Sequence, residues 1–459
     1  MRKWLFLYAA VFFFAPRHSD AADWPQYRGP LRDGVWRETG IVETLPASLR
    51  YRWKVPIEGG FAGPAVAEGR VYVTDRELAQ GQAAGENRWD IRDPVRGGER
   101  LICIDEATGR IIWVKRWPSQ YAISYPVGPR ATPTVHRGKV YVLGAMGDLF
   151  CLDAKTGDVF WSKNYVRDFG TEMNPWGMAC APLVDGDRLI IVPGGKNEAG
   201  VVALNLETGA EIWRSVEAPD PGYSAPVIVE AGGTRQLLVW LPNGLFSLDP
   251  ATGKVFWSQP AKINMGHTIV SPIFDSQRNL VFVSSFFDGP LMMRTAADSP
   301  TANVLWQGES HSELPDKTEG LHCLMSTPVF QDGLLFGICS YGKLRCLDAE
   351  TGKRLWDTLQ PTGEDRWSTA FLTRQQDRYF LFNEHGQLII AKLSREGYRE
   401  ISRAQVIEPT MQAGRRKIVW SYPAFANRCM FARNDQEIVC VDLSAEPQSS
   451  DEKTATPGK

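Results

Sequence analysis

The chain has 459 residues, a formal net charge of −2 and a hydrophobic fraction of 43%. Such a balanced charge provides no broad cationic field, so nucleic acid and anionic lipid are not expected as partners. The length fits either about three domains or one closed repeat fold.

The N-terminus has the pattern of a secretory signal peptide. Arg2 and Lys3 precede an apolar run over residues 4–15, which is shorter than the roughly 20 residues that a membrane-spanning helix needs. The small-x-small sequence Ser19-Asp20-Ala21 follows as a cleavage site. We therefore expect residues 1–21 to be removed and the mature protein to be periplasmic or secreted, with no membrane span. Residues 22–50 are expected to form an extended arm, and residues 444–459 a disordered tail.

One phrase recurs along the chain: apolar, small, apolar, Asp or Asn, two residues, Thr-Gly, three residues, Trp. Its five clear copies begin at Cys103, Cys151, Ala203, Ser247 and Cys346. The gaps after the fourth and fifth copies are each long enough for two units. A degraded copy that ends at Trp306 lies in the first gap, and another, around 387–391, lies in the second. Units of this length are typical of propeller blades.

Eight strand-entry signals mark the starts of the units, and most place a proline where it removes only one donor from the sheet. They are Gly63-Pro64, Thr132-Pro133, Ala181-Pro182, Ala225-Pro226, Ser271-Pro272, Thr327-Pro328, Thr369-Ala370 and Tyr422-Pro423. The last unit lacks a Trp strand, and a matching strand, Tyr51 to Val55, precedes the first signal. We predict an all-β, eight-bladed β-propeller of four-stranded antiparallel blades over residues 51–443, in which this N-terminal strand completes the last blade.

The repeated tryptophans are expected to be structural, wedged between neighbouring blades, because one occurs at a fixed offset in almost every unit. They are Trp53, Trp113, Trp161, Trp213, Trp257, Trp306 and Trp356. Cys103, Cys151, Cys346 and Cys440 fill the small position of the phrase, which Ala or Ser fills elsewhere, and are expected to be packed there.

Eight cysteines in an oxidising compartment permit disulfides without demonstrating them. A two-residue turn at 342–343 would place Cys339 opposite Cys346, and one at 434–435 would place Cys429 opposite Cys440. Both would be hydrogen-bonded pairs, whose Cα atoms lie farther apart than those of the other kind. Bridged and free cysteines both remain open at this point.

The phrase resembles the repeat signature of the pyrroloquinoline-quinone (PQQ)-like, or quinoprotein-type, β-propellers over residues 24–443. The segments 23–34 and 420–428 resemble those of an exported group of such propellers in planctomycete-type bacteria. The repeat is shared with the outer-membrane assembly protein BamB, which is a non-catalytic scaffold, and with quinoprotein dehydrogenases. The resemblance implies for the dehydrogenases two adjacent cysteines, a Ca²⁺ site and an Asp general base, but this chain has no Cys-Cys dipeptide.

Ligand sites of propellers usually lie on loops that lead to the innermost strands. The residues near these positions are expected at the channel mouth and are Phe61, Arg130, Trp176, Tyr223, His267, His322, Arg366, Trp367 and Trp420. Their aromatic character favours a flat apolar or sugar-like ligand or a peptide, and the alternative is that the rings only plug the channel.

Two other segments are interpreted as surface features. The loop 309–323 contains His311, Glu313, Glu319 and His322, but their spacing matches no metal motif, so a charged loop without metal is expected. The polar insertion 76–100 is either a lid or partner loop, or a tolerated insertion.

These patterns favour an exported, monomeric, non-catalytic scaffold that binds protein, peptide or glycan at the channel mouth and needs no cofactor. The alternative is a PQQ-dependent oxidoreductase that uses PQQ and Ca²⁺ on alcohols or sugars, which only the likeness of fold supports. A hydrolase or lyase acting through the 309–323 loop is a third, weaker reading.

Overall fold

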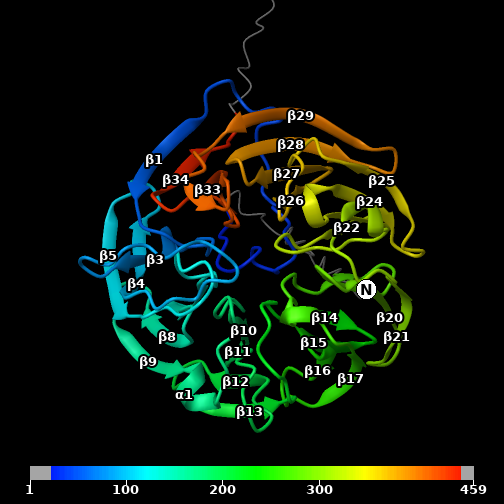
Figure 1. The fold of residues 1–459 in the computed structure, drawn as a ribbon, viewed down its shortest axis with the longest axis horizontal. Coiled ribbons are helices and arrows are strands. Elements are labelled where there is room, and N and C mark those ends of the chain that lie inside the picture. Colours follow the sequence, from blue (N-terminus) through cyan, green and yellow to red (C-terminus); the bar gives the residue numbers. More distant parts are fainter. Residues whose placement is uncertain (1–21, 446–459) are drawn as a thin grey trace, which may run out of the picture.

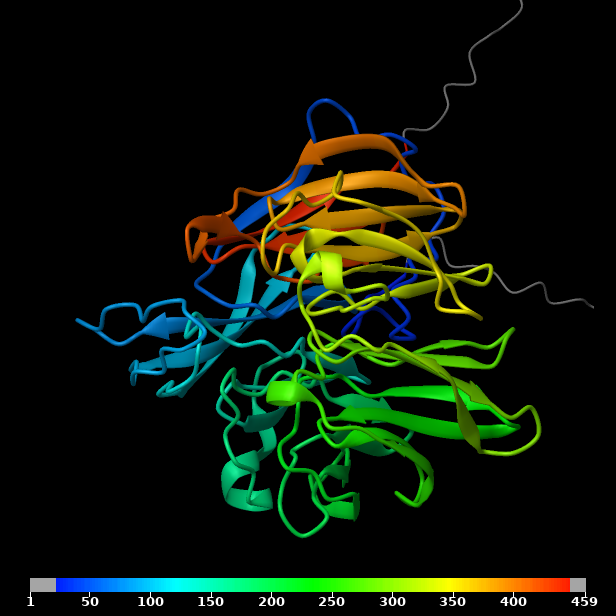
Figure 2. The ribbon, with the colours of Figure 1, turned by 45° about the vertical axis from the view of Figure 1, so that its right-hand side comes forward.

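A computed structural model describes residues 22–445, so the predicted signal peptide and nearly all of the predicted tail lie outside the described residues. The described chain forms a ring of eight four-stranded antiparallel sheets around a central axis (Figure 1; Figure 2 shows the ring tilted). The predicted all-β, eight-bladed propeller is confirmed. The helices within residues 22–445 are all too short to span a bilayer.

Each blade is a meander whose first strand lies nearest the axis. Blade 1 consists of β2 (Ala65–Ala67), β3 (Arg70–Leu78), β4 (Gly97–Asp105) and β5 (Ile111–Pro118), and blade 2 of β6 (Thr134–His136), β7 (Lys139–Leu143), β8 (Asp148–Asp153) and β9 (Val159–Asn164). Blade 3 consists of β10 (Leu183–Asp185), β11 (Arg188–Ile191), β12 (Val201–Asn205) and β13 (Glu211–Ser215), and blade 4 of β14 (Val227–Ala231), β15 (Thr234–Leu241), β16 (Gly244–Leu248) and β17 (Val255–Pro260).

Blade 5 consists of β18 (Ile273–Asp275), β19 (Leu280–Ser285), β20 (Gly289–Thr295) and β21 (Ala302–Gln307), and blade 6 of β22 (Val329–Gln331), β23 (Leu334–Ile338), β24 (Leu344–Asp348) and β25 (Arg354–Thr358). Blade 7 consists of β26 (Ala370–Gln375), β27 (Arg378–Asn383), β28 (Gln387–Leu393) and β29 (Tyr398–Gln405), and blade 8 of β32 (Ala424–Ala426), β33 (Cys429–Arg433), β34 (Glu437–Asp442) and β1 (Arg50–Pro56). A hairpin of β30 (Met411–Ala413) and β31 (Arg416–Ile418) precedes blade 8, and the helix α1 (Tyr165–Phe169) follows blade 2.

The N-terminal strand completes the last blade, as predicted. β1 pairs with β34, so that Trp53 lies opposite Cys440 and Val55 opposite Ile438. The outermost strand of blade 8 therefore comes from the opposite end of the chain, and the ring has no open gap between its last and first blades.

The repeated tryptophans join neighbouring blades. In most blades the indole N–H donates to a main-chain oxygen in the turn that follows the third strand of the next blade, over 2.7 to 3.3 Å. These pairs are Trp53–Glu106, Trp113–Ala154, Trp161–Leu206, Trp213–Pro250, Trp306–Ala349 and Trp356–Ser394. Trp257 instead donates to Gln236 Oε1 at 2.9 Å within its own blade.

The Thr-Gly turn fits this arrangement closely. Asp105 Oδ1 accepts hydrogen bonds from the main-chain N–H and hydroxyl of Thr108, and Gly109 follows with a φ of +74°. A Cβ atom on Gly109 would lie 2.7 Å from the Trp53 ring. Glycine is therefore required here both for its backbone conformation and for the close approach of the indole.

The small position of the phrase lies directly across the sheet from the tryptophan. Cys103, Cys151, Cys346 and Cys440 face Trp113, Trp161, Trp356 and Trp53, respectively. A large side chain at this position would compete with the indole for the space between blades.

The strand registers that motivated two disulfides are wrong. Cys346 faces Phe336, because the turn closes with a hydrogen bond from Cys339 N–H to Lys343 O and leaves Cys339 beside the turn. Cys440 faces Phe431, because the second turn is centred on residues 435–436 rather than 434–435. All eight cysteines lie in the described part of the chain and are buried and free.

Candidate ligand-binding pocket

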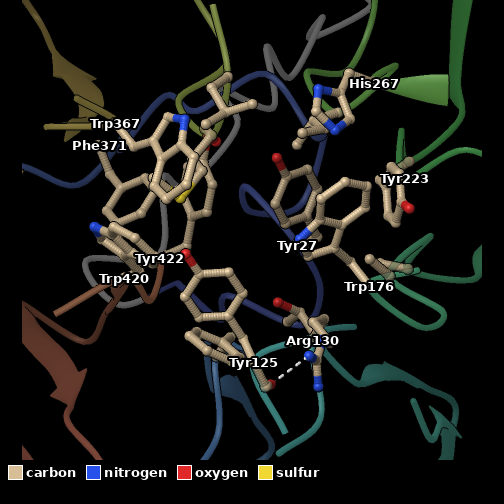
Figure 3. A pocket seen from close by; sticks show the side chains of 18 of the residues that line it. Tyr27, Tyr125, Arg130, Trp176, Tyr223, His267, Trp367, Phe371, Trp420 and Tyr422 are labelled. Atoms are coloured by element: carbon tan, nitrogen blue, oxygen red, sulfur yellow. Dashed lines mark hydrogen bonds between the residues drawn. The ribbon is translucent and has the colours of Figure 1, made fainter. Parts of the chain in front are cut away.

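The loops that lead to the innermost strands surround a pocket of about 240 Å³ at one mouth of the channel (Figure 3). Its lining is mostly aromatic and contains one charged side chain. The lining residues are Tyr27, Phe61, Trp89, Tyr125, Arg130, Thr132, Trp176, Ala179, Ala181, Tyr223, Ala225, His267, Ile269, Leu324, Met325, Trp367, Phe371, Trp420 and Tyr422.

The pocket brings together most of the residues predicted at the mouth, namely Phe61, Arg130, Trp176, Tyr223, His267, Trp367 and Trp420. Two predicted residues do not line it. His322 is buried, and its Nδ1–H donates to Phe286 O at 3.1 Å. Arg366 lies behind the wall, where its guanidinium stacks 4.6 Å from the Trp367 ring and forms two hydrogen bonds with the Glu313 carboxylate.

The N-terminal arm forms the floor of the pocket, which sequence reasoning did not predict. Tyr27 reaches into the channel, where its hydroxyl lies 3.3 Å from Thr327 Oγ1 and its ring packs edge-on against Tyr422 at 5.1 Å. The first part of the arm lies within the ring of blades, and its last part runs to the outer rim, where β1 begins (Figure 1, blue). Together with the blade entries it closes the inner end of the pocket.

Two arginines fix the arm across the channel. Arg32, which is 3% exposed, donates to the main-chain oxygens of Ala181, Pro182 and Pro226, so it binds the entries of blades 3 and 4 together. Arg28 donates to Pro328 O at the entry of blade 6. Burial lowers the pKa of Arg32 to about 9, so the guanidinium stays charged at neutral pH and binds carbonyl oxygens as a cation.

One wall of the pocket rests on the β30–β31 hairpin. Tyr125, Trp367 and Trp420 form an aromatic cluster in which the Tyr125 ring lies 6.4 Å from Trp367 and 6.0 Å from Trp420. Glu384, which is 1% exposed, accepts the Trp420 indole N–H at 2.9 Å and pairs with Arg416 of the hairpin. This buried carboxylate fixes the orientation of the wall.

The opposite wall consists of Trp176, Tyr223 and His267 (Figure 3). Trp176 packs edge-on against both His267 and Tyr223, at 4.8 and 6.0 Å, and His267 stacks on Phe287 at 5.5 Å. Desolvation by burial lowers the pKa of His267 to about 4. The imidazole is therefore neutral at physiological pH and adds no charge to the pocket.

The insertion after β3 contributes to the rim. The strands β3 and β4 extend into it, so the loop itself covers only 79–96 instead of the predicted 76–100. Asn87 donates to Gln412 O in the β30–β31 hairpin, and the Ser124 hydroxyl donates to Trp89 O. These contacts hold the loop at the mouth, where Trp89 lines the pocket with 48% of its surface still exposed.

The structure does not bring the acidic and histidine residues of the 309–323 loop into a metal site. His311 lies 3.2 Å from Asp288, Glu313 pairs with Arg366, and Glu319 pairs with Arg354 at 3.5 Å. Within residues 22–445, no group of three His, Cys, Asp or Glu side chains could hold a metal ion.

A family model described as outer membrane protein assembly factor BamB matches residues 97–358 and 197–444. The chain belongs to this family. Its PQQ-like repeat is also found in enzymes: the polyvinylalcohol dehydrogenase of Sphingopyxis sp. (strain 113P3) is 24% identical over 56% of this chain and 48% of its own length. BamB of Yersinia pestis is 24% identical over 54% of this chain and 62% of its own length. The chain thus spans about half of the first relative and under two thirds of the second.

Among solved structures, the quinohemoprotein alcohol dehydrogenase from Comamonas testosteroni superposes with a TM-score of 0.61 at 14% identity, covering 95% of this chain and 82% of the other. At this identity the likeness is one of fold. Members of the BamB family and quinoprotein dehydrogenases therefore share the PQQ-like propeller with this chain, and the chemistry of its own pocket must distinguish between them.

Proposed function

We propose that this protein is an exported, monomeric, non-catalytic binding propeller whose aromatic pocket takes a ring-bearing group of a protein, peptide or glycan partner. The observation that carries the proposal is the lining itself, which is mostly aromatic and has no carboxylate. Aromatic walls bind flat apolar or sugar rings through dispersion and CH–π contacts. Membership of the family of a named assembly factor supports a binding role.

The same lining is a poor fit for PQQ with Ca²⁺. Calcium takes six to eight oxygen ligands, largely from carboxylate and amide side chains, and no Asp, Glu, Asn or Gln lines the pocket. PQQ also carries three carboxylates, whereas Arg130 is the one charged side chain in the lining. We therefore propose that the pocket works without this cofactor.

The alternative, a PQQ-dependent oxidoreductase, is favoured by the names of several relatives, such as the quinoprotein ethanol dehydrogenase of Pseudomonas aeruginosa, 31% identical over 31% of this chain and 25% of its own length. A dye-linked oxidation assay with added PQQ and Ca²⁺ separates the two functions. Stoichiometric PQQ binding with turnover of alcohols or sugars would overturn the binding proposal.

The binding role itself is tested by screening the purified chain against glycan and peptide arrays. The strongest hits are then titrated calorimetrically with Trp176→Ala and Trp367→Ala. Each variant removes one aromatic wall and should weaken binding at least tenfold, since truncating a central aromatic anchor costs about 2 kcal/mol or more. Phe160→Ala is the matched control, because Phe160 is an aromatic residue on an outer strand, 51% exposed and remote from the pocket. Hits unaffected by both tryptophan variants would place binding elsewhere.

A further inference from the structure

The indole N–H groups and the guanidinium of the lining can only donate hydrogen bonds, whereas its hydroxyls and the neutral His267 ring can also accept them. The indole N–H groups of Trp176 and Trp367 and the hydroxyl of Tyr125 line the pocket and make no hydrogen bond within residues 22–445. The Trp420 N–H, by contrast, is already bound to Glu384. The lining has no Asp, Glu, Asn or Gln side chain to act as an acceptor. A ligand that binds here should therefore supply acceptor atoms.

Arg130 adds a fixed positive charge to this set of donors. Its Nη2 donates to the main-chain oxygens of Ser124 and Tyr125 at 2.9 and 2.6 Å, and its Nη1 donates to Gly128 O. A guanidinium has five N–H donors, so two remain for a ligand. These backbone contacts hold the side chain in place before any ligand arrives, which reduces the entropy lost on binding.

The buried Glu99 carboxylate acts on the charge of Arg130 from a distance, but among residues 22–445 no carboxylate forms a direct ion pair with Arg130. The neighbouring arginines Arg366 and Arg416 are paired with Glu313 and Glu384, respectively, whereas Arg130 forms no ion pair and lies 5.1 Å from the Phe61 ring. A partly buried charge without a direct ion-pair partner is unfavourable, and a ligand carboxylate would compensate it.

Arg32 shows that carbonyl oxygens alone can hold a buried arginine in this fold, but Arg32 is 3% exposed and does not border the pocket. Arg130 differs because it is only partly buried and borders the aromatic walls. Its position, rather than its backbone contacts, makes it a ligand-recognising residue.

We infer that the group bound in the pocket is a flat, apolar ring that carries a single carboxylate, with the ring between the Trp176 and Trp367 walls and the carboxylate on Arg130. This inference rests on the proposed binding function and specifies its ligand class. A neutral sugar fits less well, because it has no negative charge to compensate that of Arg130. A cation would be repelled by Arg130, and a ligand with several carboxylates would leave all but one unpaired.

The test uses indole-3-acetate as the probe and indole-3-acetamide as its uncharged isostere, titrated calorimetrically into the purified chain, with methyl β-glucoside as a neutral sugar. We expect the carboxylate to bind at least tenfold more tightly than the amide, and the glucoside more weakly than both. Hydrogen bonds to charged groups are stronger than neutral ones, which accounts for a preference of this size. Arg130→Gln should abolish the preference, and Arg130→Lys should keep part of it.

Arg214→Gln is the control, because Arg214 lies on the outer strand β13, pairs with Glu211 and does not line the pocket. Equal binding of acetate and amide by the wild type would overturn the inference, and so would a preference that survives in folded Arg130→Gln. In both cases Trp176-dependent binding of the amide would leave the proposed function standing. The proposed function itself would be overturned if no probe bound and if no array hit depended on Trp176 or Trp367. If Arg130→Gln does not fold, the ratio of the wild-type affinities for indole-3-acetate and indole-3-acetamide tests the inference.

Discussion

The indole N–H of Trp53 donates to the main-chain oxygen of Glu106 at 2.7 Å. Trp53 lies on β1, the borrowed strand of blade 8, and Glu106 follows the third strand of blade 1, so this hydrogen bond and the packing around it join the last blade to the first. The ring is closed by the same contact that links most of the other neighbouring blades.

Replacing Trp53 by alanine should therefore open the ring. We expect Trp53→Ala to lower the free energy of unfolding by about 3–5 kcal/mol, as large-to-small core substitutions do, and to make β1 sensitive to proteases. Trp161→Ala removes an equivalent contact between blades 2 and 3 and should destabilise without exposing β1. Urea denaturation and limited proteolysis of both variants check this, and an uncut β1 in Trp53→Ala would contradict it.

The turn glycines allow the packing against tryptophan to be measured separately from the backbone effect. Gly253 and Gly138 have φ values of +74° and +71°, so alanine is strained at both. A Cβ on Gly253 would lie 2.5 Å from the Trp213 ring, whereas a Cβ on Gly138 would meet nothing within 4 Å. Gly253→Ala should cost about 1–3 kcal/mol more than Gly138→Ala in chemical denaturation. Equal losses of unfolding free energy would mean that the Trp213 indole can shift to accommodate the added methyl group without destabilising the fold.

The arm should contribute to stability through Arg32. Arg32→Ala leaves the oxygens of Ala181, Pro182 and Pro226 without their donor in a buried site, and we expect a loss of about 3 kcal/mol or more. Arg37→Ala is the control, since this arm residue forms an exposed pair with Asp33 and should change stability by less than about 0.5 kcal/mol. Thermal unfolding of both variants would show whether the arm is part of the cooperative fold.

Two buried histidines predict a pH dependence of stability. Desolvation lowers the pKa values of His267 and His322 to about 4 in the folded chain, while unfolded histidine titrates near 6.5. As the pH falls below 6.5, the unfolded state binds protons first, so the unfolding free energy declines until about pH 4 and then levels off. Between pH 7 and 5 each histidine should contribute a loss of about 1–2 kcal/mol.

Urea midpoints of the wild type and of the double variant His267→Gln/His322→Gln at pH 7 and 5 check this. In the double variant the decline of the unfolding free energy between pH 7 and 5 should be much smaller. His311→Gln should keep it, because the His311 side chain is 74% exposed. A decline that is the same in the double variant would assign the pH dependence to other groups.

The fold could be predicted because its unit is repeated and each copy carries the same physical requirements. The tryptophan, the facing small residue and the turn glycine all serve one contact between blades, so even the split blade could be identified from Trp53. The cysteine registers could not be predicted, because they depend on which residues form each turn. The sequence around Lys343 and Asp435 permits more than one turn, and a shift of two residues moves Cys440 from Cys429 to Phe431.

The pocket could be predicted only where it follows the repeat. Trp367 was identified from its distance to a strand entry and Trp176 because it lies near one, and Thr132 and Tyr422, which begin entry signals, could have been added because they lie at the entries themselves. Tyr27 comes from outside the repeat, and its position depends on how Arg28 and Arg32 bind blades that follow much later in the chain. No local pattern reports such a contact.

The arm also has a consequence for assembly. The earliest described residues to leave the ribosome, including Arg32 and Trp53, find their partners in blades that are made later, and Trp53 must await Cys440 near the end. Contacts so distant along a chain slow folding. Refolding of the whole chain should therefore finish with docking of the N-terminal segment, and until then the incomplete eighth sheet would present a bare edge that neighbouring molecules can pair with.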